Sequence, residues 1–291
     1  MQELHILAPK EQRKLLLTPF HRWTFADLSD WCCFYRVNGN YLLRFPELAD
    51  FTIDSHTLDV HCTPTPNVSS ATITQLYLNQ ILPVVQSKSG ELVFHASAIV
   101  ADGLAIAFVG ITGRGKSTLT ASFSNNGFQF LADDGLLIKR LEADYHALPS
   151  HASLRLWEDS QAAVLGTTAK PEDPLEYTSK LRFPASHEMP HYNKSCRIRR
   201  IYFLGDLETS KIEFRKLSPQ EAMVELIKHS FLLDIDDRKT MATHFDAVSK
   251  LSTLDVFYRL DYPRNYDELA NVRSQILVHA MLDSNRSAST A

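Results

Sequence analysis

Residues 110–117 of this 291-residue chain read Gly-Ile-Thr-Gly-Arg-Gly-Lys-Ser and match the pattern Gly-x-x-x-x-Gly-Lys-Ser/Thr at every fixed position. The apolar run 104–109 before this segment has the character of a strand. Residues 117–123 after it contain neither Gly nor Pro and are expected to begin a helix. A strand, a glycine-rich turn and a helix in this order form a phosphate-binding loop, so the segment predicts a nucleoside triphosphate site.

The residue types of this loop explain how it would hold phosphate. Its three glycines let the backbone turn successive amides toward phosphate oxygens, and the helix that follows adds the positive end of its dipole. The lysine neutralises the outer phosphates and the serine hydroxyl is a ligand for Mg²⁺, which predicts ATP and Mg²⁺ as cofactors. The predicted nucleotide-binding residues here are Gly110, Thr112, Gly113, Arg114, Gly115, Lys116, Ser117 and Thr118.

A second feature is a pair of adjacent carboxylates, Asp133 and Asp134, at the end of the apolar run 127–132. Asp134 follows Ser117 by 17 residues (134 − 117), a gap that one helix and one strand fill, so the pair can return to the phosphate site. Beside a γ-phosphate, one carboxylate can hold Mg²⁺ while the other accepts the proton of an attacking hydroxyl. The competing interpretation is that Asp-Asp-Gly is only a turn.

These segments resemble a known family. The combination of His95, the loop 110–117 and Leu-Ala-Asp-Asp at 131–134 resembles the catalytic core of HPr kinase/phosphorylase and its phosphoenolpyruvate-carboxykinase-like relatives. The resemblance covers residues 91–160 well. Residues 154–157, 199–204 and 217–222 are similar to the HPr-kinase-related branch found beside lasso-peptide genes, whose members phosphorylate a precursor peptide on a serine hydroxyl.

The resemblance implies roles for individual residues. It implies Lys116 on phosphate and Asp134 as base supported by Asp133, although which aspartate does which stays open. His95 falls where these kinases place an active-site histidine, and a histidine satisfied within the core is the alternative. Glu158 lies where the bifunctional enzymes carry a Mg²⁺-binding glutamate, so the predicted metal ligands are Ser117, Asp133 and Glu158.

The surroundings of Glu158, Leu-Trp-Glu-Asp-Ser, depart from the Glu-Ile-Arg-Gly loop of the enzymes that also dephosphorylate HPr. This departure favours activity in the kinase direction only. Within the segment 177–182, Lys180 is the best candidate for a cation that closes over phosphate, and a solvated surface lysine is the alternative.

Composition and charge agree with a globular enzyme of the cytoplasm. Hydrophobic residues make up 44% and charged residues 22% of the chain, and the formal net charge of −4 provides no global basic field for nucleic acid or anionic membrane. No apolar run approaches the length of a membrane span, and the first ten residues lack the pattern of a secretory signal. We therefore expect neither nucleic acid nor membrane as a partner.

The pattern along the chain predicts an α/β (α+β) fold with two regions. Short strand candidates fill residues 1–66 and a helix runs from about residue 69 to 86, which predicts a smaller β-rich region over 1–86. Residues 87–291 would form the kinase-like core. In this core, Asp102-Gly103 predicts a tight hairpin between strands 92–100 and 104–109, and residues 160–197 a long loop region that carries substrate or gates the site.

The sequence thus predicts an ATP- and Mg²⁺-dependent kinase that transfers the γ-phosphoryl group to a serine hydroxyl of a peptide or protein, with a lasso-peptide precursor as one candidate. A kinase of a small hydroxyl substrate such as free serine and a regulatory nucleotide-binding module without turnover are the alternatives. A transport ATPase is disfavoured because no Leu-Ser-Gly-Gly-Gln signature follows the loop. A homo-oligomer is compatible with the resemblance.

Overall fold

The computed structural model describes residues 4–25, 27–166, 169–205 and 209–281. The chain divides into two compact units, one formed by residues 1–85 with 175–178 and the other by 86–174 with 179–291. The chain therefore passes covalently between the units three times, after Val85, Pro174 and Thr178. Within the described residues no helix combines the length and apolarity that a membrane crossing needs.

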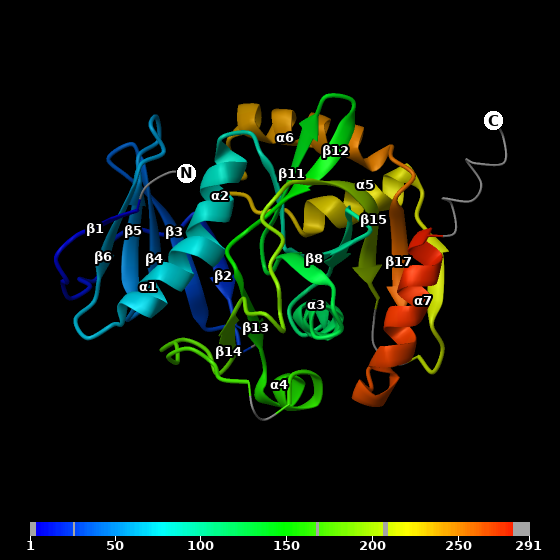
Figure 1. The fold of residues 1–291 in the computed structure, drawn as a ribbon. Coiled ribbons are helices and arrows are strands. Elements are labelled where there is room, and N and C mark those ends of the chain that lie inside the picture. The colour runs from blue at the N-terminus through cyan, green and yellow to red at the C-terminus, as the bar shows by residue number, and fades with distance from the viewer. Residues whose placement is uncertain (1–3, 26, 167–168, 206–208, 282–291) are drawn as a thin grey trace. The chain divides into compact units, whose positions relative to one another are not determined.

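The first unit is built on one six-stranded sheet (Figure 1) in the order β1-β6-β5-β4-β3-β2. Only the β1–β6 pair is parallel, and the other neighbours are antiparallel. The large side chains of Phe34, Leu43, Phe45, Phe51 and Ile53 are fully buried and form its core. The strands are β1 (Leu4–Ile6), β2 (His21–Thr24), β3 (Asp30–Val37), β4 (Asn40–Phe45), β5 (Ala49–Ile53) and β6 (Val60–Pro64).

A helical stretch follows the sheet. The sequence predicts one continuous helix here, whereas the structure divides it into two helices. The stretch begins at Ser69, whose hydroxyl accepts a hydrogen bond from the amide of Thr72, as an N-cap residue does. One π-helical turn at Tyr77–Ile81 separates α1 (Ser70–Leu76) from α2 (Leu82–Lys88). Pro83 is the second residue after this turn, and because proline has no amide hydrogen it cannot donate to the regular helical ladder.

The second unit is a mixed sheet with helices on both sides, which confirms the predicted α/β class. Its strand order is β10-β8-β9-β15-β12-β11-β7, and β17 pairs with β15 and β16. The predicted hairpin is also confirmed: β8 and β9 pair antiparallel through a turn in which Asp102 and Gly103 have φ of 50° and 73°, the signature of a type I′ turn. The strands β9, β15 and β17 then run parallel.

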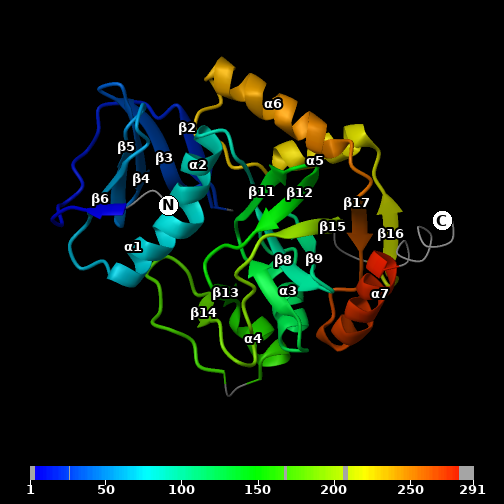
Figure 2. The same cartoon turned by 45° about the horizontal axis from the view of Figure 1, so that its top comes forward.

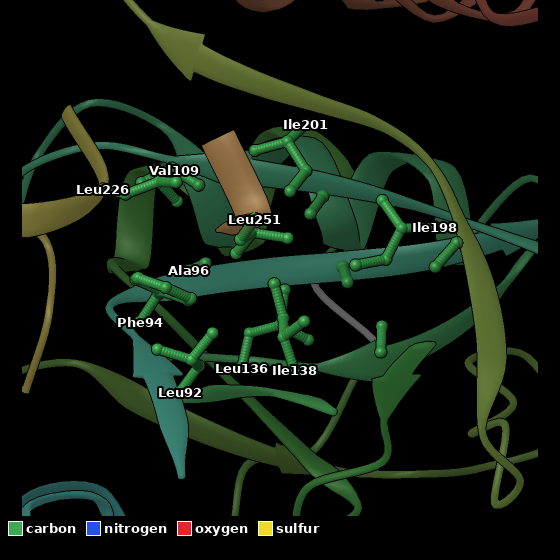
Figure 3. Close-up of a cluster of buried hydrophobic side chains, with 14 of the residues drawn as sticks. Leu92, Phe94, Ala96, Val109, Leu136, Ile138, Ile198, Ile201, Leu226 and Leu251 are labelled. Atoms are coloured by element: carbon green, nitrogen blue, oxygen red, sulfur yellow. The ribbon is translucent and has the colours of Figure 1, made fainter. Parts of the chain in front are cut away.

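Alternate side chains of β9 belong to two different apolar clusters, so both faces of this sheet are buried. Ala105, Ala107 and Val109 belong to one apolar cluster, and Ile106 and Phe108 to another, because successive side chains of a strand point to opposite faces. The first cluster includes Leu226 of α5 and Leu251 of α6, whose side chains meet those of the strands in Figure 3. The second includes residues of α3 and α7. Figure 2 shows α5 and α6 on one side of the strands and α3 on the other.

The strands of the second unit are β7 (Leu92–Phe94), β8 (Ala96–Ala101), β9 (Leu104–Val109), β10 (Gln129–Ala132), β11 (Leu136–Leu141), β12 (Asp144–Leu148), β13 (Ser153–Leu156), β14 (Leu181–Pro184), β15 (Cys196–Leu204), β16 (Glu213–Lys216) and β17 (Phe257–Asp261). The helices are α3 (Lys116–Ser124), α4 (Glu158–Val164), α5 (Pro219–Lys228), α6 (Arg238–Ser252), the short 3₁₀ helix η2 (Tyr266–Glu268) and α7 (Leu269–Met281).

The region 160–197, predicted as a long loop, contains one strand that the sequence does not signal. Residues 181–184 form β14, which pairs with β13 in a separate two-stranded sheet. Pro184 ends this strand, and such a residue lowers the local strand signal because it removes a ladder donor. The remainder has no long regular element among its described residues.

Phe108 provides a test of this core. It is fully buried and stacks on Phe123 and Tyr202, with ring centroids 5.9 and 6.3 Å away. The variant Phe108→Ala should lose about 3–5 kcal/mol of unfolding free energy in denaturant titration, because it removes buried surface and leaves a cavity. The control Phe245→Ala, at a side chain that is 41% exposed, should lose less than about 1 kcal/mol. Equal losses would contradict the assigned core.

Candidate active site

Three strand ends of the second unit meet at one edge of its sheet. In the register of the sheet, Ala96 at the start of β8 lies opposite Val109 at the end of β9, and Ala98 lies opposite Ala132 at the end of β10. The phosphate-binding loop follows Val109, and Asp133 follows Ala132. The antiparallel arrangement of β8 between β9 and β10 therefore brings together segments that are distant in sequence.

The loop between β9 and α3 has the conformation that its glycines permit. Gly113 and Gly115 have φ of 85° and 84°, in the left-handed region that costs glycine least. A Cβ on Gly115 would lie 2.8 Å from the hydroxyl of Tyr262, so this position also needs the small residue for a close approach. Gly115 is the residue that precedes the first turn of α3.

The side chain of Lys116 folds back over the loop that precedes it. Its Nζ donates to the carbonyl oxygens of Gly110, at 2.7 Å, and Ile111, at 3.2 Å. Burial is the main influence on this ammonium and lowers its pKa to about 8, although Asp134 and Asp133 act in the opposite direction. A phosphate in the loop would supply the negative charge that this lysine needs to stay protonated.

Asp133 is a buried carboxylate bound by three donors. Its Oδ1 accepts from the hydroxyls of Ser97, at 2.6 Å, and Ser117, at 2.8 Å, and its Oδ2 accepts from the amide of Arg155, at 3.0 Å. Burial and the neighbouring Asp134 raise the pKa of Asp133, and these hydrogen bonds oppose that rise. Asp133 thus lies directly behind the hydroxyl of Ser117.

Asp134 has a different environment and a left-handed backbone, with φ of 62°. Its Oδ2 accepts from Nε of Arg155 at 2.9 Å, and both side chains are almost completely buried. Burial alone would raise the pKa of Asp134, but the charge of Arg155 and then that of Lys180 outweigh it and hold the pKa well below its usual range. Arg155 and Lys180 therefore favour the ionised form of Asp134.

His95 lies beside this pair as a neutral ring. Its amide donates to the carbonyl of His229 at 2.7 Å, and its Nδ1 lies 3.2 Å from the carbonyl oxygen of Asp134. Burial, followed by the charge of Lys116, lowers the pKa of His95 to about 3. Because a carbonyl oxygen can only accept, Nδ1 carries the proton in this contact and Nε2 is left as the acceptor.

His95, Lys116 and Asp134 line one cavity of about 270 Å³ that lies entirely within the second unit. Four cationic side chains and two carboxylates line it, so its charge suits a polyanion. The cations are Lys116, Arg155, Lys180 and Arg264, and the carboxylates are Asp134 and Asp159. The ammonium of Lys180 lies 5.5 Å from the ring centroid of Trp157, which also lines the cavity.

The other part of the cavity contains residues that sequence reasoning missed. Arg264 stacks on Tyr262 at 3.8 Å and donates to the carbonyl oxygens of Arg114, at 2.8 Å, and Gly205, at 3.0 Å, which links the segment after β17 to the phosphate-binding loop. The hydroxyl of Tyr266 donates to Asp159 at 2.8 Å. These residues carry no local motif, so only their tertiary position reveals them.

The structure brings most of the predicted residues to this cavity. Its lining includes His95, Thr112, Gly113, Gly115, Lys116, Ser117, Thr118, Asp134 and Lys180. Gly110 and Arg114 contribute backbone carbonyls to the contacts of Lys116 and Arg264, and Asp133 lies beneath Ser117. The prediction lacks Ser97 of β8, which lies two residues after His95. A serine among apolar residues is the only available signal for it.

Glu158 is the exception among the predicted metal ligands. It is the first residue of α4, it is exposed, and the neighbouring Asp159 lines the cavity in its place. Successive residues of a helix point about 100° apart, which explains why one position turns to solvent and the next to the cavity. The described residues contain no group of three or more His, Cys, Asp or Glu side chains that could hold a metal.

A site for Mg²⁺, if the protein binds this ion, would have to use Ser117 and Asp133 together with phosphate oxygens. Mg²⁺ is usually bound through one or two carboxylates, substrate phosphates and water. The hydroxyl of Ser117 and the carboxylate of Asp133, 2.8 Å apart beside the phosphate-binding loop, are oxygen donors that fit this mode.

The chain is similar in structure to several solved proteins, one of which is named here. The solved structure of the Hpr(Ser) kinase/phosphatase from Coxiella burnetii matches with 14% sequence identity and a TM-score of 0.35, over 68% of this chain and 99% of that chain. No protein-family model and no curated protein sequence matches the chain. The assignment of the site therefore depends on its own residues.

Gly115 offers a test of the nucleotide site. The variant Gly115→Ala should weaken ATP binding at least tenfold, because its Cβ would displace Tyr262 and Arg264 from a loop that needs a left-handed residue. Isothermal titration calorimetry measures the affinity. Gly103→Ala is the control, since Gly103 also has a positive φ, of 73°, but nothing lies within 4 Å of its Cβ position. Unchanged affinity in Gly115→Ala would contradict the proposed phosphate site.

Lys116 predicts the pH dependence of binding. Bound phosphate favours the charged lysine, whereas the free protein loses this proton as pH rises through about 8. ATP affinity should therefore be constant below that pH and fall by up to about tenfold per pH unit above it. Lys116→Arg, whatever its absolute affinity, should show no such slope, because guanidinium stays charged. A flat wild-type profile from pH 7 to 9 would contradict this account.

Proposed function

We propose that this chain is an ATP-dependent kinase that transfers the γ-phosphoryl group to a hydroxyl, with serine in a peptide or protein as the acceptor. One observation carries the proposal: the buried carboxylate of Asp134, paired with Arg155, lines the same cationic cavity as the phosphate-binding loop. A binding module needs the loop and its cations. A carboxylate at this place costs affinity for a polyanion, and a role in transfer explains its presence.

The two carboxylates divide the work in this proposal. Asp133, with Ser117 directly against its Oδ1, would hold Mg²⁺ together with that hydroxyl. The ion would neutralise charge that develops on the phosphate oxygens. Asp134 faces the acceptor and takes the proton of its hydroxyl. This assigns the base, a choice that the sequence leaves open.

The low pKa of Asp134 is compatible with that role. A phosphoryl group passes through a loose transition state in which the attacking hydroxyl has formed little bond, so orientation of the hydroxyl matters more than strong basicity. Arg155 fixes one oxygen of Asp134 and keeps the group ionised. A carboxylate that accepts a hydrogen bond from the attacking hydroxyl and orients it therefore suffices as the base of this reaction.

Cations and a neutral histidine complete the proposed machinery. Lys116 and Lys180 line the cavity and would stabilise charge on the transferring group. His95 holds the backbone of Asp134 through Nδ1 and does not compete as a cation, because its pKa lies near 3. Its role in the proposal is to position the carboxylate.

The acceptor rests on the resemblance of residues 91–160 and of the later segments to the HPr-kinase-related branch. On that basis a serine of a lasso-peptide precursor is the first acceptor to test, in a protein that acts in the cytoplasm. Free serine is the small-molecule alternative. A nucleotide-binding module without turnover remains the competing function, because it would use the same loop.

The experiment that tests the proposal is incubation of the purified protein with γ-labelled ATP, Mg²⁺ and three acceptor sets, namely candidate precursor peptides ending in serine, HPr, and free serine. Transfer of label to serine is the expected result, and the labelled set identifies the acceptor class. ATP binding without transfer to any of the three would contradict the proposal in favour of the binding module.

Replacement of the proposed base separates transfer from binding. Asp134→Asn should lower kcat at least about 100-fold while ATP affinity is unchanged or higher, because a negative charge beside the phosphates is lost. Steady-state kinetics and calorimetry measure the two quantities. In the matched control Asp159→Asn, at the Tyr266 side of the cavity, kcat should change less than about threefold. Unchanged kcat in Asp134→Asn would refute the assignment.

A further inference from the structure

Arg264, three residues after the end of β17, bridges two chain segments of the second unit at the phosphate-binding loop. Its Nη1 donates to the carbonyl oxygen of Arg114, inside the loop, at 2.8 Å. Its Nη2 donates to the carbonyl oxygen of Gly205, directly after β15, at 3.0 Å. The planar guanidinium holds these two donors in a fixed relation, which an ammonium does not. One side chain therefore ties the loop to the end of β15.

Tyr262 holds this guanidinium in place. Its ring centroid lies 3.8 Å from Cζ of Arg264, and burial raises the pKa of the Tyr262 phenol to about 12, so the ring stays neutral. A Cβ on Gly115 would lie 2.8 Å from the Tyr262 hydroxyl and 3.4 Å from Nη1 of Arg264. The stacked pair thus packs directly against the loop. Arg264 itself is exposed, so its truncation would leave no cavity in the core.

The contact with Arg114 fixes more than a carbonyl group. A peptide unit is planar and trans, so the carbonyl of Arg114 and the amide of Gly115 point in opposite directions. A guanidinium that holds this carbonyl therefore also sets the direction of that N–H. Gly115 lines the cavity, and loops of this kind bind anions through converging N–H groups. Lys116 acts in the same way on the carbonyls of Gly110 and Ile111, so two cationic side chains hold the loop by its carbonyl oxygens.

We propose that Arg264 is a positioning residue for nucleotide binding: it holds the peptide unit between Arg114 and Gly115 so that the amide of Gly115 is directed at a phosphate oxygen before the ligand arrives. The inference rests on the proposed function only for the nature of the ligand, a polyphosphate. A loop whose amides are already oriented loses less conformational freedom when it binds. Loss of Arg264 should therefore loosen the loop and weaken the binding of every ligand that carries the phosphates.

The first test needs neither nucleotide nor catalytic activity. Trypsin cleaves after Arg114, at the carbonyl that Arg264 holds, when the loop opens, so Arg264→Ala should raise the rate of this cleavage at least about fivefold. Cleavage after Arg200, which is buried in β15, requires the core to unfold and should not change. Arg140→Ala, at an exposed arginine of β11, is the matched control. An unchanged rate after Arg114 in Arg264→Ala would overturn the proposal, whether or not the protein is a kinase.

A second test separates positioning of the loop from direct contact with the ligand. Calorimetry with inorganic tripolyphosphate and with ATP should show that Arg264→Ala weakens both by the same factor, about tenfold, because both ligands need the loop. Arg264→Lys should stay at least about threefold weaker than wild type, since one ammonium does not reproduce the fork that reaches both carbonyls. A loss confined to ATP would show contact with the nucleoside, and full recovery with lysine would show that only the charge matters. Either result would overturn the positioning role.

Failure of the proposed function gives a different result. If the wild-type protein binds neither tripolyphosphate nor ATP, the assigned phosphate site is wrong, and cleavage after Arg114 still decides whether Arg264 holds the loop.

Discussion

The candidate site depends on the hydrogen bonds that the buried carboxylate of Asp133 accepts. This carboxylate joins Ser97 of β8, Ser117 of α3 and the amide of Arg155 in β13, three segments that the sheet alone would not connect. A charge that is 1% exposed is unfavourable unless donors surround it, so the fold must keep these three in place. Ser97 and the amide of Arg155 hold the carboxylate, and its third hydrogen bond holds the hydroxyl of Ser117 beside the phosphate-binding loop. The hydrogen bonds that stabilise this buried carboxylate therefore also set the position of the Ser117 hydroxyl.

Two adjacent carboxylates acquire opposite properties from this arrangement. Hydroxyls and an amide hold Asp133, and burial beside Asp134 raises its pKa. Arg155 holds Asp134, whose pKa falls well below its usual range. The backbone amide of Arg155 donates to Asp133, and its guanidinium donates to Asp134. A single residue of β13 thus separates a group suited to metal from a group suited to an acceptor hydroxyl.

The sequence predicts the features that depend on interactions between residues close together in the chain. It does not predict those that depend on contacts between distant residues. The phosphate-binding loop and the Asp102-Gly103 hairpin depend on neighbours in the chain, and both form as their patterns indicate. Arg264 reaches Arg114 across 150 residues, and no local pattern reports such a contact. Glu158 shows the same limit on a smaller scale. The start of α4 decides which of two adjacent carboxylates faces the cavity, and that start depends on tertiary packing.

The most direct measurement of the central claim is a crystal structure of the protein with Mg²⁺ and an ATP analogue whose β,γ bridge resists cleavage. The account predicts phosphates on the amides of residues 113–118 and a metal about 2.1 Å from oxygens of Ser117 and Asp133. It also predicts the γ-phosphate between Lys116 and Asp134. A nucleotide bound elsewhere, or phosphates in the loop with Asp134 turned away from them, would contradict it.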